Sequence, residues 1–90
     1  MIHYDRVKLG EVLREAREGA GFTQIDVASR LGYSSSQFIS NVERGVSVVP
    51  LNTLSKLIKL YSMPLESIVK ILMESQREVL KKEFKRYRAN

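Results

Sequence analysis

The 90-residue sequence has no cysteine and a single histidine. Without cysteine, neither a disulfide framework nor thiol chemistry can form, and a lone His3 near the N-terminus cannot assemble a metal site. The sequence therefore excludes disulfide-stabilised folds and predicts a protein without a metal or cofactor. Because the absence of cysteine fits a reducing compartment, we expect a cytoplasmic protein.

A segment long enough to cross a membrane is also missing. The longest uncharged run, residues 31–42, has twelve residues, well short of the roughly 20 needed to span a bilayer. No apolar stretch follows the N-terminal Met-Ile-His-Tyr-Asp, as an export signal would require. We therefore expect a soluble protein that is not exported.

Patterns typical of catalytic sites are absent as well. The sequence has no nucleophile with an accompanying base, no clustered carboxylates beyond ordinary helix charges, and no glycine-rich phosphate loop. Ninety residues suffice for one compact domain and leave little room for a separate pocket. We expect a binding protein and not an enzyme.

Strand signals are weak, because no long run alternates apolar with polar residues. Helix breakers are also few, since the only prolines are Pro50 and Pro64. The sequence thus predicts an all-α fold. We expect helices over 6–19, from Thr23 to Gly32, in a short segment ending at Gly45, near 51–61, and from Pro64 to Arg88.

Capping residues and apolar periodicity define these helices. Asp5 and Thr23 are good N-caps, Asp26 places a carboxylate near the positive helix end, and Ser34 with Gln37 has the spacing of a capping box. The residues expected to face the core are Leu9, Val12, Leu13, Ala16, Ile25, Val27, Ala28, Leu31, Phe38, Ile39, Val42, Leu51, Leu54, Leu57, Ile58, Tyr61, Leu65, Ile68 and Leu72.

The charge is distributed unevenly. A net charge of +5 and a pI near 9.7 favour an acidic partner such as nucleic acid. Residues 1–50 carry six basic and six acidic side chains, whereas residues 51–90 carry nine and four. Electrostatic attraction to a polyanion must therefore come largely from the C-terminal half.

The C-terminal segment carries a narrow apolar stripe of coiled-coil type. Its members are Val69, Met73, Gln76, Leu80, Phe84 and Tyr87, and six basic and two acidic residues flank it between Arg77 and Arg88. Three interpretations remain open: a dimer-forming helix, an arm along a DNA backbone, and a solvated helix packed on its own domain. We place a domain over 5–72 and a basic helical extension over 73–90, and we favour dimerisation.

The stretch "GYSSSQFISNVERG", residues 32–45, contains a short helix whose outward face carries amides and hydroxyls. A merely solvated face is usually filled with Glu and Lys, which favour helix and stay hydrated. Gln37 and Asn41 lie four residues apart, hence on one face, beside Ser36 and Ser40. Such a face suits the edges of DNA bases, although a solvated polar helix is the alternative.

The ordered segments "GFTQIDVASRLG", "ISNVERG" and "PLNTLSKLIKLYSMPLESI" resemble the phage repressor and Cro-like (lambda repressor-like) helix-turn-helix family. The resemblance covers about residues 9–72 and implies a five-helix domain, here with an extended basic C-terminal helix. The turn between Gly32 and Ile39 is one residue longer than the family pattern. Close approach of the two motif helices favours small residues, and Ala28 and Gly32 meet that need.

The resemblance also assigns roles to individual residues. It implies base contacts from Ser36, Gln37 and Asn41, with Ser40 beside them, and it implies that Gln24 contacts phosphate and braces the recognition helix. Further candidates for phosphate contacts are Thr23, Ser35, Arg44 and Asn52.

Arg17 and Glu43 match positions that the family often pairs as a structural clasp between the first and third helices. The alternative is two unpaired surface charges. The loop over 45–50 departs from the family's basic pattern by offering valines, among them Val48, which either packs on a partner subunit or forms a plain loop.

Together these features predict a sequence-specific transcription regulator, a repressor, that binds a two-fold symmetric DNA operator as a homodimer. A phage-type repressor, an antitoxin and the controller of a restriction-modification system all fit. The alternative from another class is a protein-interaction module, antitoxin-like, that uses the 45–50 loop and the C-terminal helix to bind a partner such as a toxin.

Overall fold

A computed structural model describes residues 4–88, so His3 lies outside the described residues. Over these residues the chain forms five α-helices and no strand, which confirms the predicted all-α fold. The helices are α1 (Arg6–Gly19), α2 (Gln24–Arg30), α3 (Gln37–Glu43), α4 (Leu51–Leu60) and α5 (Leu65–Arg88). None of these helices is long and apolar enough to cross a membrane.

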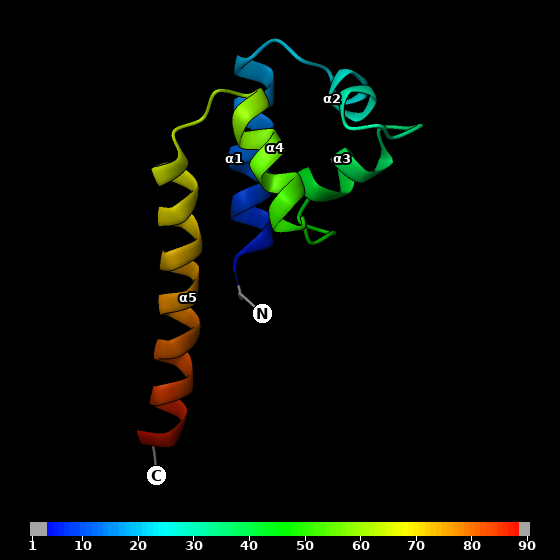
Figure 1. Ribbon diagram of the computed structural model, residues 1–90. Helices are drawn as coiled ribbons and strands as arrows, with labels where there is room; N and C mark the ends of the chain where they lie inside the picture. Colours follow the sequence, from blue (N-terminus) through cyan, green and yellow to red (C-terminus); the bar gives the residue numbers. More distant parts are fainter. Residues whose placement is uncertain (1–3, 89–90) are drawn as a thin grey trace.

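The first four helices form the domain, and α5 lies along one side of it (Figure 1). In this view α5 and α3 lie on opposite sides of α1 and α4, and the C-terminal half of α5 continues past the start of α1. The molecule is accordingly elongated, with extents of 52 × 24 × 19 Å. The face of α3 that is turned away from the domain is therefore not covered by α5.

The N-terminal ends of α1 and α2 are fixed by their predicted caps. The Asp5 carboxylate accepts from the Lys8 amide at 3.1 Å. At α2 the Thr23 hydroxyl accepts from the Asp26 amide, while the Asp26 carboxylate accepts from the Thr23 amide, which completes a capping box. These hydrogen bonds lower the pKa of Asp26.

The capping box predicted for Ser34 and Gln37 does not form. Helix α3 begins at Gln37, so its N-cap is Ser36, which makes no side-chain capping bond. The third helical residue is then Ile39, whose apolar side chain cannot complete a capping box. The backbone amide of Gln37 donates instead to the Ser35 hydroxyl at 3.4 Å.

One core joins the helices, and most of the predicted apolar residues contribute to it. The buried members are Leu9, Leu13, Val27, Ala28, Ile39, Val42, Val49, Leu54, Leu57, Tyr61, Ile68 and Ile71. Partly buried residues packed against them include Val12, Ala16, Leu31, Phe38, Ile58 and Leu72.

Three of the predicted core residues, Ile25, Leu51 and Leu65, are exposed, so these predictions were wrong. Each lies in the first turn of its helix, where the side chain leans back toward the N-terminus and past the neighbouring helices. Val49 and Ile71 are buried although neither was expected to be.

Close approach of α1 and α3 depends on Gly10. A Cβ atom at this position would lie 2.5 Å from the carbonyl oxygens of both Val42 and Glu43. Since real Cβ atoms do not approach backbone oxygens so closely, only glycine lets α1 pack directly against the end of α3. This contact fixes where α3 sits relative to the rest of the domain.

Candidate nucleic-acid interface

The segment from α2 to α3 is closed by a tight turn. The side chains of Val27 and Ala28 have no exposed surface, which lets the two helices approach closely. Gly32 follows α2 with φ +85°, a left-handed conformation that favours glycine, as the sequence predicted. The Tyr33 amide then donates to the Ala28 carbonyl at 2.9 Å and reverses the chain.

An aromatic pair links this turn to α3. The rings of Tyr33 and Phe38 lie with centroids 5.0 Å apart and planes tilted by 30°. Tyr33 belongs to the turn and Phe38 to α3, so their contact attaches the turn to the helix that follows it.

The inner end of α3 is held by an ion pair between Arg17 and Glu43. Arg17 Nε donates to Glu43 Oε2 at 2.7 Å, and Arg17 Nη2 donates to Glu43 Oε1 at 3.1 Å, which is a bidentate arrangement. Both residues are buried, at 8% and 7% exposure. The two predicted partners are therefore brought together between α1 and α3.

The Arg17–Glu43 pair is extended by two further groups. Gln24 Nε2 donates to Glu43 Oε1 at 3.0 Å, so the first residue of α2 is tied to the last residue of α3. Arg17 Nη1 donates to the backbone carbonyl of Phe22 at 2.8 Å, so Arg17 also holds the loop before α2. We call Arg17, Gln24 and Glu43 the clasp. It fixes α1, α2 and α3 to one another.

The electrostatics of the clasp favour its charged state. The hydrogen bond to Glu43 raises the pKa of Arg17, against the opposing effect of desolvation, so the guanidinium stays protonated. Burial raises the pKa of the neighbouring Tyr61 phenol to about 12, and the charge of Glu43 acts in the same direction. No buried side-chain polar atom among the described residues lacks a hydrogen-bond partner.

The outward face of α3 carries a hydrogen-bonded row of Gln37, Asn41 and Arg44. Gln37 Nε2 donates to Asn41 Oδ1 at 2.9 Å, and Arg44 Nη2 donates to the same oxygen at 2.6 Å. Asn41 is half-buried, and its two neighbours are exposed. We call these three side chains the polar row.

The family described as "Helix-turn-helix domain" matches residues 8–68, which include the clasp and the polar row. The chain belongs to this helix-turn-helix family. The matched segment ends near the beginning of α5, so the projecting part of that helix lies outside it. No curated protein matches the sequence.

In this helix-turn-helix domain, α2 is the first helix of the motif and α3 is the second, which in such motifs enters the major groove. The other predicted base contacts, Ser36 at the N-cap of α3 and Ser40 within α3, are half-buried. The structure thus places three of the four predicted base-contact residues on α3 and the fourth, Ser36, at its N-cap.

The predicted phosphate contacts are more dispersed. Gln24 braces α3 through Glu43, as the resemblance implied, and Thr23 caps α2. The Ser35 hydroxyl accepts from the backbone amide of Gln37. Asn52 is exposed at the start of α4, where its side-chain oxygen Oδ1 accepts from the Thr53 backbone amide at 2.9 Å.

Arg44 is placed in the polar row, a role that sequence reasoning did not assign to it. The spacing of Asn41 and Arg44, three residues apart on a helix, is a signal that could have indicated it. The contribution of the Phe22 carbonyl to the clasp has no such signal, because any residue type supplies a backbone oxygen.

The predicted dimer contacts fall into two groups. Val48 lies exposed in the loop after α3, while Met73, Leu80, Phe84 and Tyr87 are exposed on α5. Val69 is half-buried. The loop itself is anchored where the Val49 amide donates to the Tyr4 hydroxyl at 3.2 Å.

Proposed function

We propose that this helix-turn-helix protein is a sequence-specific DNA-binding transcription regulator of the phage repressor and Cro-like type. It acts as a repressor, without catalysis, and binds a two-fold symmetric operator as a homodimer. The observation that carries this proposal is the polar row on the outward face of α3, supported from behind by the buried clasp.

The polar row matches what base edges offer. Its internal hydrogen bonds use Gln37 Nε2 and Asn41 Oδ1. The side-chain oxygen Oε1 of Gln37 and the side-chain nitrogen Nδ2 of Asn41 make no hydrogen bond within the described residues. One acceptor and one donor are thus available to a base pair, and adenine presents a complementary donor and acceptor in the major groove. A good pairing of this kind discriminates against the wrong base by about 1 to 3 kcal/mol.

The clasp supports this role by fixing α3 before DNA arrives. A recognition helix that is already held by α1 and α2 loses little conformational freedom on binding. Thr23, Gln24, Ser35 and Asn52 are the proposed contacts to the DNA backbone, which set the position of α3 in the groove. Most of the positive charge comes from residues 51–90.

Selection of bound duplexes from a random pool tests the proposal directly. We expect one enriched sequence with two-fold symmetry, and affinity that weakens with salt by about 0.9 in log K for each phosphate neutralised. Recovery of random sequences would contradict specific recognition.

The variants Gln37→Ala and Asn41→Ala test the assignment of the polar row. Each is expected to reduce the preference for the selected duplex by about 1 to 3 kcal/mol while sparing the weaker binding to unrelated DNA. The measurement is a competition titration of selected against scrambled duplex. Unchanged preference in both variants would place sequence readout elsewhere.

A second candidate function is the binding of a protein partner, as in an antitoxin. It is favoured by an apolar hollow of about 230 Å³ lined by Tyr4, Val48, Val49, Pro50, Leu51 and Leu54, next to exposed valines of the 45–50 loop. The roles of phage repressor, antitoxin and restriction-modification controller are separated by the neighbouring reading frames. A toxin or a methyltransferase gene beside this one would decide between them.

A further inference from the structure

The C-terminal half of α5 carries two rows of side chains that the rest of the described chain leaves uncovered. The apolar row, whose members are between 47% and 71% exposed, consists of Met73, Leu80, Phe84 and Tyr87. The basic row, whose members are exposed as well, consists of Arg77, Lys81, Lys85 and Arg88.

The two rows run side by side along the helix. Steps of three, four or seven residues keep the members of each row on one face. Lys81, Lys85 and Arg88 each directly follow a member of the apolar row, so the basic row lies about 100° further round the helix. An open hollow of about 680 Å³ is lined by members of both rows. The hollow therefore has an apolar side and a positively charged side.

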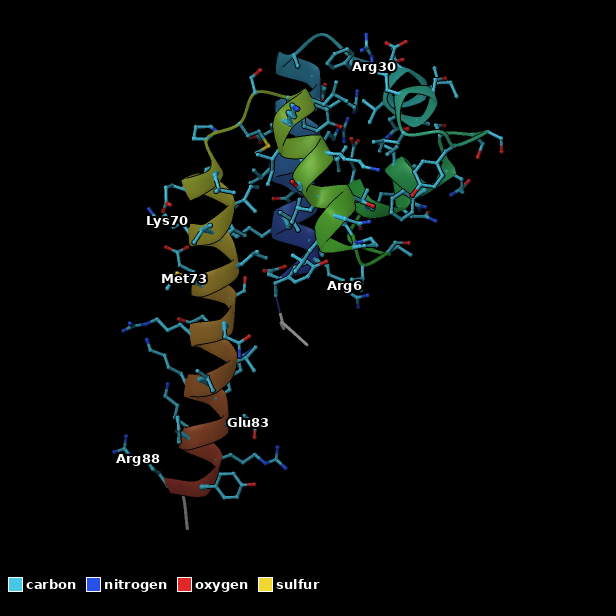
Figure 2. The ribbon with its side chains drawn as sticks, in the orientation of Figure 1. Arg6, Arg30, Lys70, Met73, Glu83 and Arg88 are labelled. Carbon is cyan, nitrogen blue, oxygen red and sulfur yellow. The ribbon has the colours of Figure 1, made fainter. Side chains whose placement is uncertain are left out.

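Both rows lie away from the domain that carries them. Ile68 and Ile71 are the buried residues of α5 and define its inner face. Figure 2 shows Met73 and Arg88 on the other side of the helix, away from the domain. What covers the rows must therefore come from outside this chain's own domain.

The charge of the basic row is available to a partner. Lys81 pairs with Glu78 at 3.8 Å, but this pair is exposed and contributes little. Arg77, Lys85 and Arg88 form no ion pair with another residue among residues 4–88. The basic row thus offers cations beside an apolar surface.

The DNA that α3 would enter cannot cover these rows. Helices α5 and α3 lie on opposite sides of α1 and α4, so the outer side of α5 is turned away from that duplex (Figure 1). A phosphate backbone would also leave the apolar row exposed to water. The rows therefore have a partner other than the operator.

A second copy of α5 is a poor partner because it brings the same charge. Residues 77–88 carry six basic and two acidic side chains, so two such segments repel each other. The charge of the rows selects an acidic surface instead.

An anionic membrane matches this charge but does not match the face that carries the apolar row. Glu83 lies three residues after Leu80 and four before Tyr87, hence at the edge of the same face. Figure 2 shows Glu83 on the opposite side of α5 from Arg88. A helix lying in a lipid interface buries its whole apolar face, which would remove the Glu83 carboxylate from water at a cost. A narrow apolar row suits a second helix better.

We propose that the two rows form a docking site for an acidic amphipathic helix of another protein. Apolar side chains of that helix pack along Leu80 and Phe84, and carboxylates on one of its edges pair with the basic row. This inference goes beyond the proposed function, because it concerns a surface that DNA recognition does not use. The homodimer of the proposed function then depends on the other predicted contact, at Val48.

The edges of the apolar row also define which helix fits. Acids along one edge of the partner meet the basic row, whereas acids along its other edge would face Glu83 and be repelled. The partner helix therefore carries its acids on one edge only. This asymmetry fixes the direction in which it lies along α5.

The probe for the test is a labelled synthetic peptide of roughly 20 residues, with leucine at the a and d positions of a heptad repeat and glutamate along one edge. Its binding to the full chain without DNA is measured by fluorescence anisotropy. We expect saturable binding, and a peptide with glutamine in place of every glutamate should bind at least about tenfold more weakly.

Two charge-reversed double variants separate local pairing from general attraction. Arg77→Glu with Lys81→Glu should weaken binding of the acidic peptide at least about tenfold and strengthen binding of a peptide with lysine in place of glutamate. Lys82→Glu with Arg86→Glu is the matched control. It makes the same change in charge at the same spacing, but neither residue lines the hollow. This control should change the affinity less than about threefold.

A third double variant tests the apolar row. Leu80→Gln with Phe84→Gln should weaken binding of the acidic peptide at least about tenfold. Its control is Leu65→Gln, which alters an exposed leucine of α5 outside both rows. Circular dichroism verifies that all variants stay folded.

Four outcomes overturn the proposal. They are the absence of binding by the acidic peptide, equal binding by the glutamine peptide, equal losses in the two charge-reversed variants, and unchanged binding after Leu80→Gln with Phe84→Gln. Vesicles of phosphatidylglycerol that displace the peptide, where phosphatidylcholine vesicles do not, would assign the rows to a lipid surface and overturn it too. A failure of operator selection is separate, because these measurements contain no DNA.

Discussion

At the residue scale, Glu43 organises the helix-turn-helix motif. Its carboxylate accepts two hydrogen bonds from Arg17 and one from Gln24, and both Glu43 and Arg17 are buried. A buried carboxylate that loses its cation keeps the cost of desolvation without the compensating attraction. The stability of the domain therefore depends on both charges being present.

Replacing Arg17 by alanine is expected to lower the free energy of unfolding by about 3 to 5 kcal/mol, because Glu43 would remain buried without its partner. Thermal unfolding followed by circular dichroism measures the change. The control is Arg14→Ala, since Arg14 pairs with Glu18 at 3.0 Å on the exposed surface. That variant should lose at most about 1 kcal/mol. Equal losses in both variants would refute the buried clasp.

Tyr61 provides a prediction for high pH. Its pKa is raised from 10.0 to about 12 in the folded protein, because burial disfavours the phenolate. A raised folded pKa means that the folded state holds its proton more tightly, so this contribution to stability is complete below pH about 10 and is lost as pH rises toward about 12. Absorbance titration should show one late tyrosinate, which Tyr61→Phe removes. A late step that persists in the variant would assign it to another tyrosine.

Arg44 offers a choice between two roles that one titration separates. If Arg44 orients Asn41 through their 2.6 Å hydrogen bond, Arg44→Ala should reduce the preference for the selected duplex and leave the salt dependence unchanged. If it binds phosphate instead, the variant should weaken binding to all duplexes alike and reduce the salt slope by about 1. We expect the first result. Salt titrations with selected and scrambled duplexes measure both quantities.

At the element scale, the position of α3 is set by its contacts with α1 more than by its own stability. With seven residues, α3 is too short to be stable alone, and its N-cap residue Ser36 makes no side-chain capping bond. It is held at its C-terminal end, both by the clasp and by the close approach of Gly10 to the Val42 and Glu43 carbonyls. Helix α1 therefore acts as the support against which the recognition helix is placed.

Gly10→Ala tests this close approach. The added Cβ would meet backbone oxygens of Val42 and Glu43 at 2.5 Å, so α1 and α3 must separate. Overpacking of this kind costs about 1 to 3 kcal/mol, and operator affinity should fall with it. Gly19→Ala, also on α1, is the control, because a Cβ there meets no atom within 4 Å. Denaturant unfolding that gives equal stabilities for the two variants would contradict the close packing.

At the scale of the whole molecule, α3 and the projecting part of α5 lie on opposite sides of α1 and α4 (Figure 1). Helix α3 carries the polar row, and α5 carries the exposed apolar residues Met73, Leu80, Phe84 and Tyr87. Most of the positive charge belongs to the half of the chain that contains α5. The predicted division into a domain over 5–72 and an extension over 73–90 stays a prediction, which fits the family match ending at residue 68.

The sequence predicted most of the fold because local physics determines it. Helix periodicity, the caps at Asp5 and Thr23, and the glycine that ends α2 act over a few neighbouring residues, and the structure has them as expected. Local signals failed at helix ends. Apolar periodicity predicted that Ile25, Leu51 and Leu65 would be buried, but all three are exposed. Periodicity does not show where a neighbouring helix ends, and that end decides whether a first-turn side chain is covered.

The sequence by itself determined that this chain is helical, that it carries a helix-turn-helix pattern, and that its charge lies toward the C-terminus. Only the tertiary structure decided that Glu43 is the partner through which Gln24 braces α3, that Arg44 donates to Asn41, and that α3 packs against α1 at Gly10. The physical reason is that helix formation depends on neighbours in sequence. Hydrogen bonds between side chains, and the room for a Cβ atom, depend on distances that exist only after the helices have packed.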